Sequence, residues 1–353
     1  MSHSKWLDAS RSLAQTNVFA MFFLGVSAGI PLLLIFSSLG LWLREAGIDR
    51  ATATLFSWAA LGYSFKFVWA PLADKLPLPM LSQRLGQRRS WLLLSQLMVI
   101  LAIILMSSVN PAQDSLFLMA SAAVLLGFSS ATQDIIIDAY RIESADNNQQ
   151  AILSASYIAG YRSGMVLSGA GALLLASYLG SSSHNYNYSA WQLTYLCMAA
   201  FMLIGIITTL IIQEPNHSAS RIEPQNHHEH WQLLMLFTFL VSSFIGSYWV
   251  SSDASIIAKS HLSVILSSQA LANFLIECCR LMAGIASAAL VAKLLVINKL
   301  IPISLVEKSY LDPIRDFFNR YGLSLALLLL ALVGLYRISD IVLGVISNIF
   351  YQD

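Results

Sequence analysis

Charged residues are scarce in this chain. Of its 353 residues, 11% are charged and 57% are hydrophobic, whereas about 25% of the residues of a soluble domain are charged. This composition, with a mean hydropathy of +0.66, excludes a water-soluble enzyme and indicates an integral membrane protein. The acidic and basic residues nearly balance, at a net charge of +1, so we expect no nucleic-acid partner.

Cysteines and catalytic motifs are also few or missing. The three cysteines, Cys197, Cys278 and Cys279, lie in apolar segments, and two of them are adjacent. This pattern excludes the spaced disulfide framework of a small secreted domain. The sequence has no nucleophile elbow, zinc-protease motif, phosphate-binding loop or protein-kinase motif set. We therefore predict neither an enzyme nor a bound cofactor.

Long apolar segments make up most of the chain. A membrane-spanning helix needs about 20 mainly apolar residues, and this criterion predicts an all-α polytopic membrane protein with about nine transmembrane helices. The first apolar segment is too long for the core of a cleaved signal peptide, so we predict an uncleaved first span. The predicted spans are 18–43, 51–74, 91–109, 115–138, 151–180, 191–213, 231–253, 263–298 and 321–351.

Lysine and arginine are distributed unevenly among the connections between these spans. If the N-terminus is cytoplasmic, most of them fall on the cytoplasmic side, whereas Arg44, Arg50 and Lys259 fall on the opposite side. Cytoplasmic connections of membrane proteins contain an excess of Lys and Arg. We therefore predict a chain embedded in the lipid bilayer with its N-terminus in the cytoplasm.

Two polar connections divide the predicted bundle into domains. The first contains His217, His227, His228 and His230, but no cysteine or further ligand pattern accompanies them, so we predict a solvated linker and no metal site. The predicted domains are an N-terminal six-helix half over 1–213, a cytoplasmic His-rich linker over 214–230, an extra transmembrane helix pair over 231–298, a cytoplasmic basic amphipathic connection over 299–320 and a final helix over 321–353.

Glycines recur at helical spacing in the first and fifth spans. Gly25 and Gly29 lie four residues apart in the first span, as do Gly160 and Gly164 in the fifth, and this spacing lets two helices approach closely. Pro31 removes a backbone donor and can kink its helix. Two interpretations are open: these residues pack the helices together, or they form a flexible point about which the half-bundle rocks.

Several charged residues lie within the predicted spans. Asp134 and Asp138 lie four residues apart and share one helix face, next to Gln133 in the sequence. Lys66 and Arg162 lie in the cytoplasmic halves of the second and fifth spans. Charge inside a bilayer is costly, so an intramembrane carboxylate pair indicates a functional site. We expect the two acids and two bases to meet, either as a proton-carrying cluster or as a static ion-pair network.

Two further groups of charged residues stand out, one near the cytoplasmic end of the second predicted span and one in the last predicted span. Asp74 precedes a loop that ends at Arg88 and Arg89, and ion pairs between them could close the inner ends of two helices as a gate. Arg337 and Asp340 lie three residues apart in the last span, where we expect them to line a cavity.

These motifs together resemble those of the AmpG-type anhydromuropeptide permeases of the major facilitator superfamily. The resemblance extends over residues 20–350, and QDIIIDAYR, GYRSGM and KFVWAPLAD are its specific pieces. The matching pieces are GVSAGIPL (25–32), WL-x-x-x-GI (42–48), YSFKFVWAPLADK (63–75), LGQRRSWLLLSQ (85–96), ATQDIIIDAYR (131–141), GYRSGMVLSGAGAL (160–173), PIRDFF (313–318) and LYRISD (335–340).

The resemblance implies a major facilitator-type bundle in the bacterial inner membrane. It implies the proton-driven import of N-acetylglucosaminyl-1,6-anhydromuramyl peptides from periplasm to cytoplasm, for peptidoglycan recycling. It also implies a part in proton coupling or substrate binding for the charged positions. The candidate coupling or substrate-binding residues are Asp134, Asp138, Lys66, Arg162, Gln133, Tyr63, Arg337 and Asp340, and the candidate gate-loop residues are Asp74, Arg88 and Arg89.

Two alternatives to this function stay open. Acetyl-coenzyme A transporters share part of the pattern, and a non-transporting membrane protein could use the same charges only to stabilise packing. A complete superfamily member has two six-helix halves, whereas this sequence ends after the expected first helix of the second half. We therefore expect the second half to be incomplete, and a missing C-terminal half to be needed for an alternating-access cavity.

Overall fold

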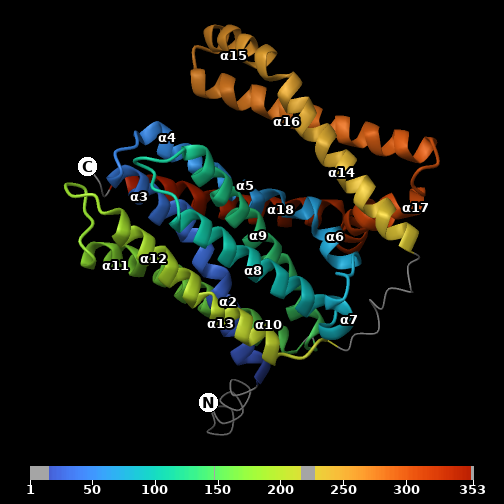
Figure 1. Cartoon of the computed structure of the whole chain (residues 1–353). Helices are drawn as coiled ribbons and strands as arrows, with labels where there is room; N and C mark the ends of the chain where they lie inside the picture. The colour runs from blue at the N-terminus through green and yellow to red at the C-terminus, as the bar shows by residue number, and fades with distance from the viewer. Residues whose placement is uncertain (1–15, 147, 216–226, 351–353) are drawn as a thin grey trace, which may run out of the picture. The chain divides into compact units, whose positions relative to one another are not determined.

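Helices form the regular secondary structure of the chain (Figure 1). The computed structural model describes the backbone over residues 16–146, 148–215 and 227–350, and the side chains there except at 60, 61, 227, 228 and 336–350. The chain divides into two compact units, Met1–Arg221 and Ile222–Asp353. The division falls inside the segment 214–230 that the sequence predicts to be a linker.

Within the described residues, eight helices are long and apolar enough to cross a membrane. They follow the order of eight of the nine predicted spans, which confirms the all-α polytopic architecture. Their bounds are Thr16–Glu45, Gln87–Ser107, Leu116–Glu143, Gln150–Tyr178, Tyr188–Ile211, Glu229–Val250, Gln269–Ile297 and Ile303–Leu335.

The second predicted span, 51–74, is not one continuous helix in the structure. The chain there forms short α-helices separated by two 3-10 turns, and Pro71 lies in the first turn of the last of them. Proline cannot donate the hydrogen bond that an uninterrupted α-helix needs at that position. The segments are α4 (Arg50–Leu55), a 3-10 turn (Phe56–Ala60), α5 (Leu61–Phe65), a 3-10 turn (Lys66–Val68) and α6 (Ala70–Lys75).

The ends of these helices follow from local sequence. Gly47 has a φ of +87° after α3 (Leu39–Glu45), a conformation that glycine adopts at little cost. Asp49 then begins α4, because its side chain accepts a hydrogen bond from the Thr52 amide at 3.0 Å. Such a cap satisfies a free donor of the first helical turn. The hydrogen bonds from Thr52 lower the pKa of Asp49 below its ordinary value.

The first unit is a bundle in which α2 packs along α10 and α8 packs along α9. A π-helical turn, Leu34–Ser38, follows Pro31 and joins α2 to α3 within the first span. The other helices of the unit are α2 (Thr16–Leu33), α7 (Leu81–Leu85), α8 (Gln87–Ser107), α9 (Leu116–Glu143), α10 (Gln150–Val166), α11 (Ala172–Tyr178), α12 (Tyr188–Phe201) and α13 (Leu203–Ile211).

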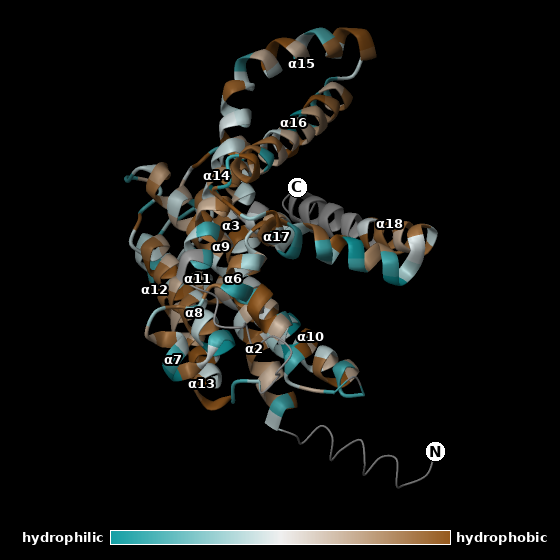
Figure 2. Cartoon of the chain, turned by 90° about the vertical axis from the view of Figure 1, so that its right-hand side faces the viewer, coloured by the Kyte–Doolittle hydropathy of each residue, from teal (hydrophilic) through white to brown (hydrophobic). Residues whose placement is uncertain are grey.

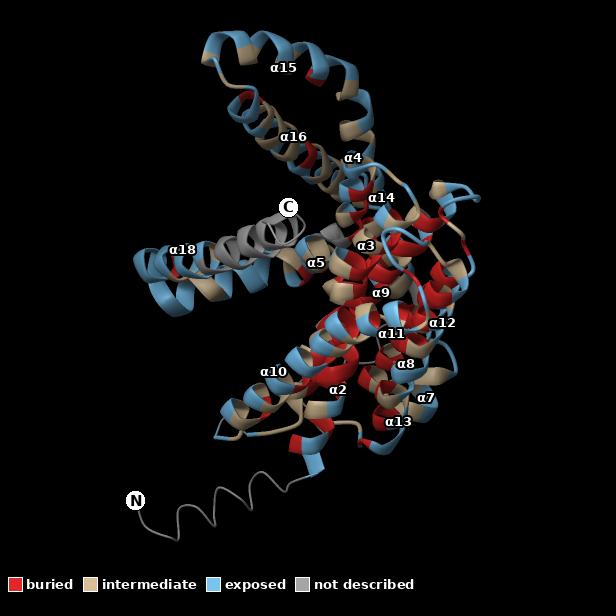
Figure 3. Ribbon diagram, turned by 90° about the vertical axis from the view of Figure 1, so that its left-hand side faces the viewer, coloured by how far each residue is buried: buried red, intermediate tan, exposed pale blue. Residues whose placement is uncertain are grey.

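The buried residues of the first unit lie between these helices (Figure 3). At the end of the bundle that contains α3 and α12, Trp42 stacks on Trp191, with ring centroids 5.7 Å apart, and both are fully buried beside Tyr195. Glu45 accepts hydrogen bonds there from Trp191 and Ser181. A second buried cluster lies near the opposite end, around α2 and α9. The helices of the bundle are therefore packed closely enough to hold polar side chains in fixed positions.

Residues 227–297 of the second unit form three helices where the sequence predicts a transmembrane pair. They are α14 (His227–Val250), α15 (Ser252–Leu266) and α16 (Gln269–Ile297). Residues 254–262, between the predicted spans 231–253 and 263–298, lie inside α15. The remaining elements are α17 (Ile303–Val306), a π-helical turn (Glu307–Leu311) and α18 (Asp312–Phe350). At Gly322 the φ of +72° marks a kink in α18.

Candidate functional site

A cluster of charged side chains lies on α9 and its neighbours. Asp138 lies between two cations: Lys66 Nζ is 4.0 Å from Oδ2, and Arg141 Nη2 is 3.5 Å from Oδ1. Arg141 is held in turn by Ser154, to which it donates a 2.8 Å hydrogen bond. We call Lys66, Asp134, Asp138 and Arg141 the Asp138 cluster. It brings Lys66 and Asp138 together as the sequence predicts.

Neither cation is within ordinary hydrogen-bond distance of Asp138, because strong charge-assisted bonds are about 2.7–2.9 Å long. The side chains of Lys66 and Asp138 are 36% and 47% exposed. An exposed ion pair of this length contributes about 0–1 kcal/mol to stability. The two ion pairs of Asp138 therefore contribute little to the stability of the fold.

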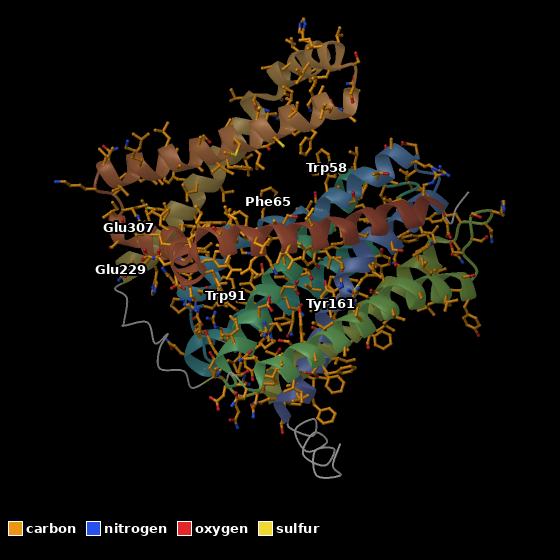
Figure 4. All side chains as sticks on the ribbon, turned by 180° about the vertical axis from the view of Figure 1, so that it is seen from behind. Trp58, Phe65, Trp91, Tyr161, Glu229 and Glu307 are labelled. Atoms are coloured by element: carbon orange, nitrogen blue, oxygen red, sulfur yellow. The ribbon has the colours of Figure 1, made fainter. Side chains whose placement is uncertain are left out.

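Asp134 lies one helical turn before Asp138 and is surrounded by phenols. Its carboxylate accepts a hydrogen bond from the Tyr157 hydroxyl at 3.3 Å, and its residue is only 7% exposed. The rings of Tyr157 and Tyr161 lie 5.9 Å apart on α10. Tyr63 donates to Ser130 at 2.6 Å and is within electrostatic range of Asp134 and Tyr161. Figure 4 labels Tyr161 among the side chains of this unit. Aromatic faces and hydroxyl groups thus adjoin the acids.

Gln133 lies on the side of α9 that faces the interior of the bundle. It is fully buried and donates to Ser27 Oγ on α2 at 2.5 Å. Gln96 on α8 is also fully buried and accepts from Thr209 on α13. Among the described residues, Gln133 Oε1 and Gln96 Nε2 have no hydrogen-bond partner. Gln133 is therefore bound to α2 through its amide nitrogen, whereas its amide oxygen has no hydrogen-bond partner among the described residues.

Arg162 does not join this cluster, although the sequence led us to expect it there. It is exposed on α10, and its guanidinium donates to Met165 Sδ at 3.8 Å. The helical position of a residue fixes its depth in the membrane, but the rotation of the helix decides which neighbour it faces. Arg141 supplies the second cation of the Asp138 cluster instead.

A second charge network joins the C-terminal ends of α6 and α9 to the N-terminal end of α8, the ends that the sequence predicts to be cytoplasmic. Arg88 contacts Asp74 at 2.6 Å and forms two hydrogen bonds with Glu143, at 2.5 and 2.9 Å. Its side chain is 9% exposed. We call Asp74, Arg88 and Glu143 the inner-end network. It contains the pair of Asp74 and Arg88 that the sequence predicts for a gate loop, and the gating role stays a prediction.

The remaining contacts at this end tie α13 to α8. Glu214 accepts hydrogen bonds from the backbone amides of Arg88 and Arg89 at 2.8 and 3.0 Å, where a carboxylate is favoured by the helix N-terminus. The Arg89 guanidinium donates to the carbonyl oxygens of Thr209 and Leu210. Arg89 therefore binds the end of α13, and its guanidinium has no contact with Asp74 in this structure.

Replacement of Arg88 by Met is expected to destabilise the first unit by about 3 kcal/mol, because removal of one partner of a buried ion pair leaves the other charges unpaired. Thermal unfolding in detergent micelles and the rate of proteolysis between α6 and α8 measure this effect. Arg84→Met, at an exposed position of the same connection, is the matched control. Equal melting temperatures for the two variants would contradict the predicted role of the network.

The four glycines of the first and fifth spans lie where α2 and α10 touch. A Cβ atom on Gly25 would overlap the carbonyl oxygen of Tyr157, and one on Gly29 would overlap that of Tyr161. Gly160 and Gly164 face the backbone of α2 in the same way, at Phe22 and at Val26. These glycines therefore allow backbone contact between the two helices. A rocking motion about Pro31 stays a prediction.

Some predicted sites lie outside the described residues. The side chains of Arg337 and Asp340 are among these, and so are His217 and the side chains of His227 and His228. The described residues contain no group of three or more His, Cys, Asp or Glu side chains that could hold a metal ion.

Residues that the sequence did not assign to a site include Tyr157, Arg141, Glu143 and Glu214. Each contacts a predicted site residue or its backbone. A signal for the two acids exists in the sequence: each lies close to a helix end, and Glu214 precedes Pro215. An acid in such a setting indicates a counter-ion for the nearby arginines.

Comparison with known proteins gives the family. The model of the Major Facilitator Superfamily matches residues 12–351. The transporter AmpG 4 of Rickettsia felis is 42% identical over 198 residues, which cover 56% of this chain and 45% of that protein. The anhydromuropeptide permease of Escherichia coli K12 is 35% identical over 205 residues, covering 58% and 39%. The transporter AmpG 3 of Rickettsia prowazekii is 30% identical over 238 residues, covering 62% and 54%.

The chain spans about half the length of the curated relatives it matches. The family model, in contrast, matches nearly all of the chain. These matches confirm the resemblance to anhydromuropeptide permeases that the motifs predicted. The chain therefore belongs to the Major Facilitator Superfamily, a family of membrane transporters rather than of enzymes.

Proposed function

We propose that this chain takes part in the proton-driven import of N-acetylglucosaminyl-1,6-anhydromuramyl peptides across the bacterial inner membrane, for peptidoglycan recycling. The observation that supports this most directly is the position of Asp138 between Lys66 and Arg141, at 4.0 and 3.5 Å. The partial identity with a permease of E. coli named for anhydromuropeptides supports the substrate class.

The Asp138 cluster suits such a substrate in charge and in shape. The peptide part of a muropeptide has carboxylates, and Lys66 is a half-exposed cation that only a long ion pair holds. When Asp138 takes up a proton, Lys66 loses its partner and is available for a substrate carboxylate. The paired rings of Tyr157 and Tyr161 offer apolar faces and hydroxyl groups beside the charged groups, as ligand sites commonly do.

We further propose that the N-terminus is cytoplasmic, as the distribution of Lys and Arg predicts. The substrate cavity of a major facilitator lies between two halves. The chain spans about half the length of its curated relatives. We therefore propose that it forms one wall of the cavity and that a second half of the same fold forms the opposite wall.

The test is the accumulation of labelled anhydromuropeptide in E. coli cells that lack their own permease. The full chain is expressed alone and together with the second half of the E. coli permease. We expect uptake in at least the second case, and we expect a protonophore to abolish it. Membrane abundance of the chain is measured in parallel.

The absence of uptake in both cases, with the chain present in the membrane at normal abundance, would contradict the proposed substrate. The same cells are then assayed with labelled acetyl-coenzyme A, because the motif pattern is shared in part with transporters of that cofactor. Accumulation of acetyl-coenzyme A would assign the chain to that class instead.

A further inference from the structure

The first part of α18, residues 312–321, forms a helix of its own. Gly322, which follows it, has a φ of 72° and a ψ of 159°, values outside the helical region that glycine adopts at little cost. The helix axis therefore changes direction at Gly322. This helix makes up the last part of the connection that the sequence predicts over 299–320, and we call it the connecting helix.

The connecting helix has a polar side and an apolar side. Residues three, four or seven positions apart share one face of a helix, and both sides follow this spacing. Figure 2 shows hydrophilic and hydrophobic residues along α18. Apart from Pro313 in the first turn, the polar side consists of Asp312, Arg315, Asp316, Asn319 and Arg320, and the apolar side consists of Ile314, Phe317, Phe318 and Tyr321.

The polar side of the connecting helix balances its own charge. Arg315 lies 3.9 Å from Asp312, and Arg320 lies 2.6 Å from Asp316. These four side chains are between 53% and 67% exposed. Because two basic and two acidic residues cancel, this side is suited to water and needs no charged partner.

The apolar side of the connecting helix is aromatic and partly exposed. The ring of Phe317 lies edge-on to that of Phe318, with centroids 5.6 Å apart, and its centroid is 5.3 Å from that of Tyr321. Ile314 is 57% and Tyr321 is 45% exposed. Exposure of apolar surface to water is unfavourable, so an apolar environment that covers this side stabilises the helix.

The distribution of charge shows where the chain enters the hydrocarbon core. The segment 307–320 contains six charged residues, and their cost excludes it from the core. The segment 321–336 contains none, and its Leu323 and Leu328 are 67% and 64% exposed. It lies in the last of the helices that are apolar enough to cross a membrane. The boundary therefore falls near Gly322, where the helix axis changes direction.

We propose that the connecting helix lies along the surface of the lipid bilayer, with its apolar side among the upper acyl chains and its polar side in water. Amphipathic helices lie in the membrane interface in this way, and aromatic residues are enriched there. The turn at Gly322 then directs the chain from the bilayer surface into the hydrocarbon core.

Lipid is the occupant that the position of the connecting helix favours. The helix is about 15 Å long at 1.5 Å per residue, and a single residue, Gly322, joins it to the apolar segment that follows. The apolar side is thus held beside the bilayer by the chain itself. The polar side has no net charge with which to attract a charged protein. The bilayer surface can therefore cover the apolar side without a further partner.

The test uses the full chain with its three cysteines replaced by Ala, after its membrane abundance has been matched to that of the native chain. Single cysteines are introduced by Ile314→Cys and Tyr321→Cys on the apolar side. Asn319→Cys, on the exposed polar side of the same helix, is the matched control. In lipid nanodiscs, which leave both membrane surfaces accessible, each is labelled with a hydrophilic maleimide. Each is also labelled with an environment-sensitive fluorophore in nanodiscs of brominated-acyl lipids.

Ile314 and Tyr321 are exposed in the chain itself, so the reaction rates report on what surrounds the helix. We expect the cysteines at 314 and 321 to react about tenfold more slowly than the cysteine at 319, as burial of an apolar side chain predicts. We also expect brominated lipids to quench their fluorophores. Equal reaction rates at all three positions would place the apolar side in water and overturn the proposal. Slow reaction without quenching would place a protein there and would overturn it as well.

Discussion

Asp138→Asn is expected to abolish proton-driven uptake while the amount of protein in the membrane stays unchanged. Asparagine keeps the size of the side chain but cannot take up and release a proton. Because Asp138 is nearly half exposed and its two ion pairs are long, their loss costs only about 0–1 kcal/mol. The effect on transport is therefore expected to be far larger than the effect on stability.

The measurement is the initial rate of labelled muropeptide uptake, normalised to the membrane abundance of each variant. Asp312→Asn is the matched control, since it removes a carboxylate from an exposed ion pair with Arg315 at 3.9 Å, and we expect it to retain full uptake. Lys66→Met should resemble Asp138→Asn. Loss of both site variants from the membrane would instead favour a packing role for the Asp138 cluster.

Gly29→Ala is expected to destabilise the first unit, although alanine is the better helix former. A methyl group at this position would overlap the carbonyl oxygen of Tyr161 and approach the amide of Met165. The backbone of α10 would then have to move away from α2, and overpacking of this kind costs about 1–3 kcal/mol. The gain from helix propensity, about 1 kcal/mol, does not offset this cost.

Gly40→Ala is the matched control, because Gly40 belongs to the same span and has no atom within 4 Å of an added Cβ. The two substitutions are chemically identical, and we expect opposite signs: a lower melting temperature in detergent for Gly29→Ala and an equal or higher one for Gly40→Ala. Equal melting temperatures for Gly29→Ala and Gly40→Ala would contradict the backbone contact of Gly29 with α10 and would favour a flexible point there.

The parts of the fold that depend on composition and residue spacing could be predicted from the sequence. Eight of the spans follow from apolar length alone, and the contact of Gly25 and Gly29 with α10 follows from their spacing. The pairs of Lys66 with Asp138 and of Asp74 with Arg88 follow from the cost of leaving a charge unpaired in the membrane. In each case the length of an apolar segment, the spacing of residues or the cost of an unpaired charge determines the structure.

The rest depends on the rotation of helices about their axes, which spacing does not fix. Arg162 is exposed on α10 and donates to Met165 instead of an acid, and Arg141 on α9 itself takes its place. Glu143 and Glu214 meet Arg88 and its backbone across 55 and 126 residues of chain. The ion pair of Lys259 on α15 could not be recognised, because its partner, Glu277, lies on the next helix.

The interruptions in the second predicted span bear on what surrounds this segment in the membrane. The segment from Arg50 to Lys75 changes between α-helical and 3-10 geometry at the depth of the Asp138 cluster. Hydrocarbon offers no hydrogen bonds to a backbone, so irregular segments persist inside a bilayer only against protein or a hydrated cavity. Trp58 and Phe67 are exposed on the open side of this segment, where we expect another protein surface or a solvated passage. If this side is solvated, we expect water and ions to reach Lys66 along it.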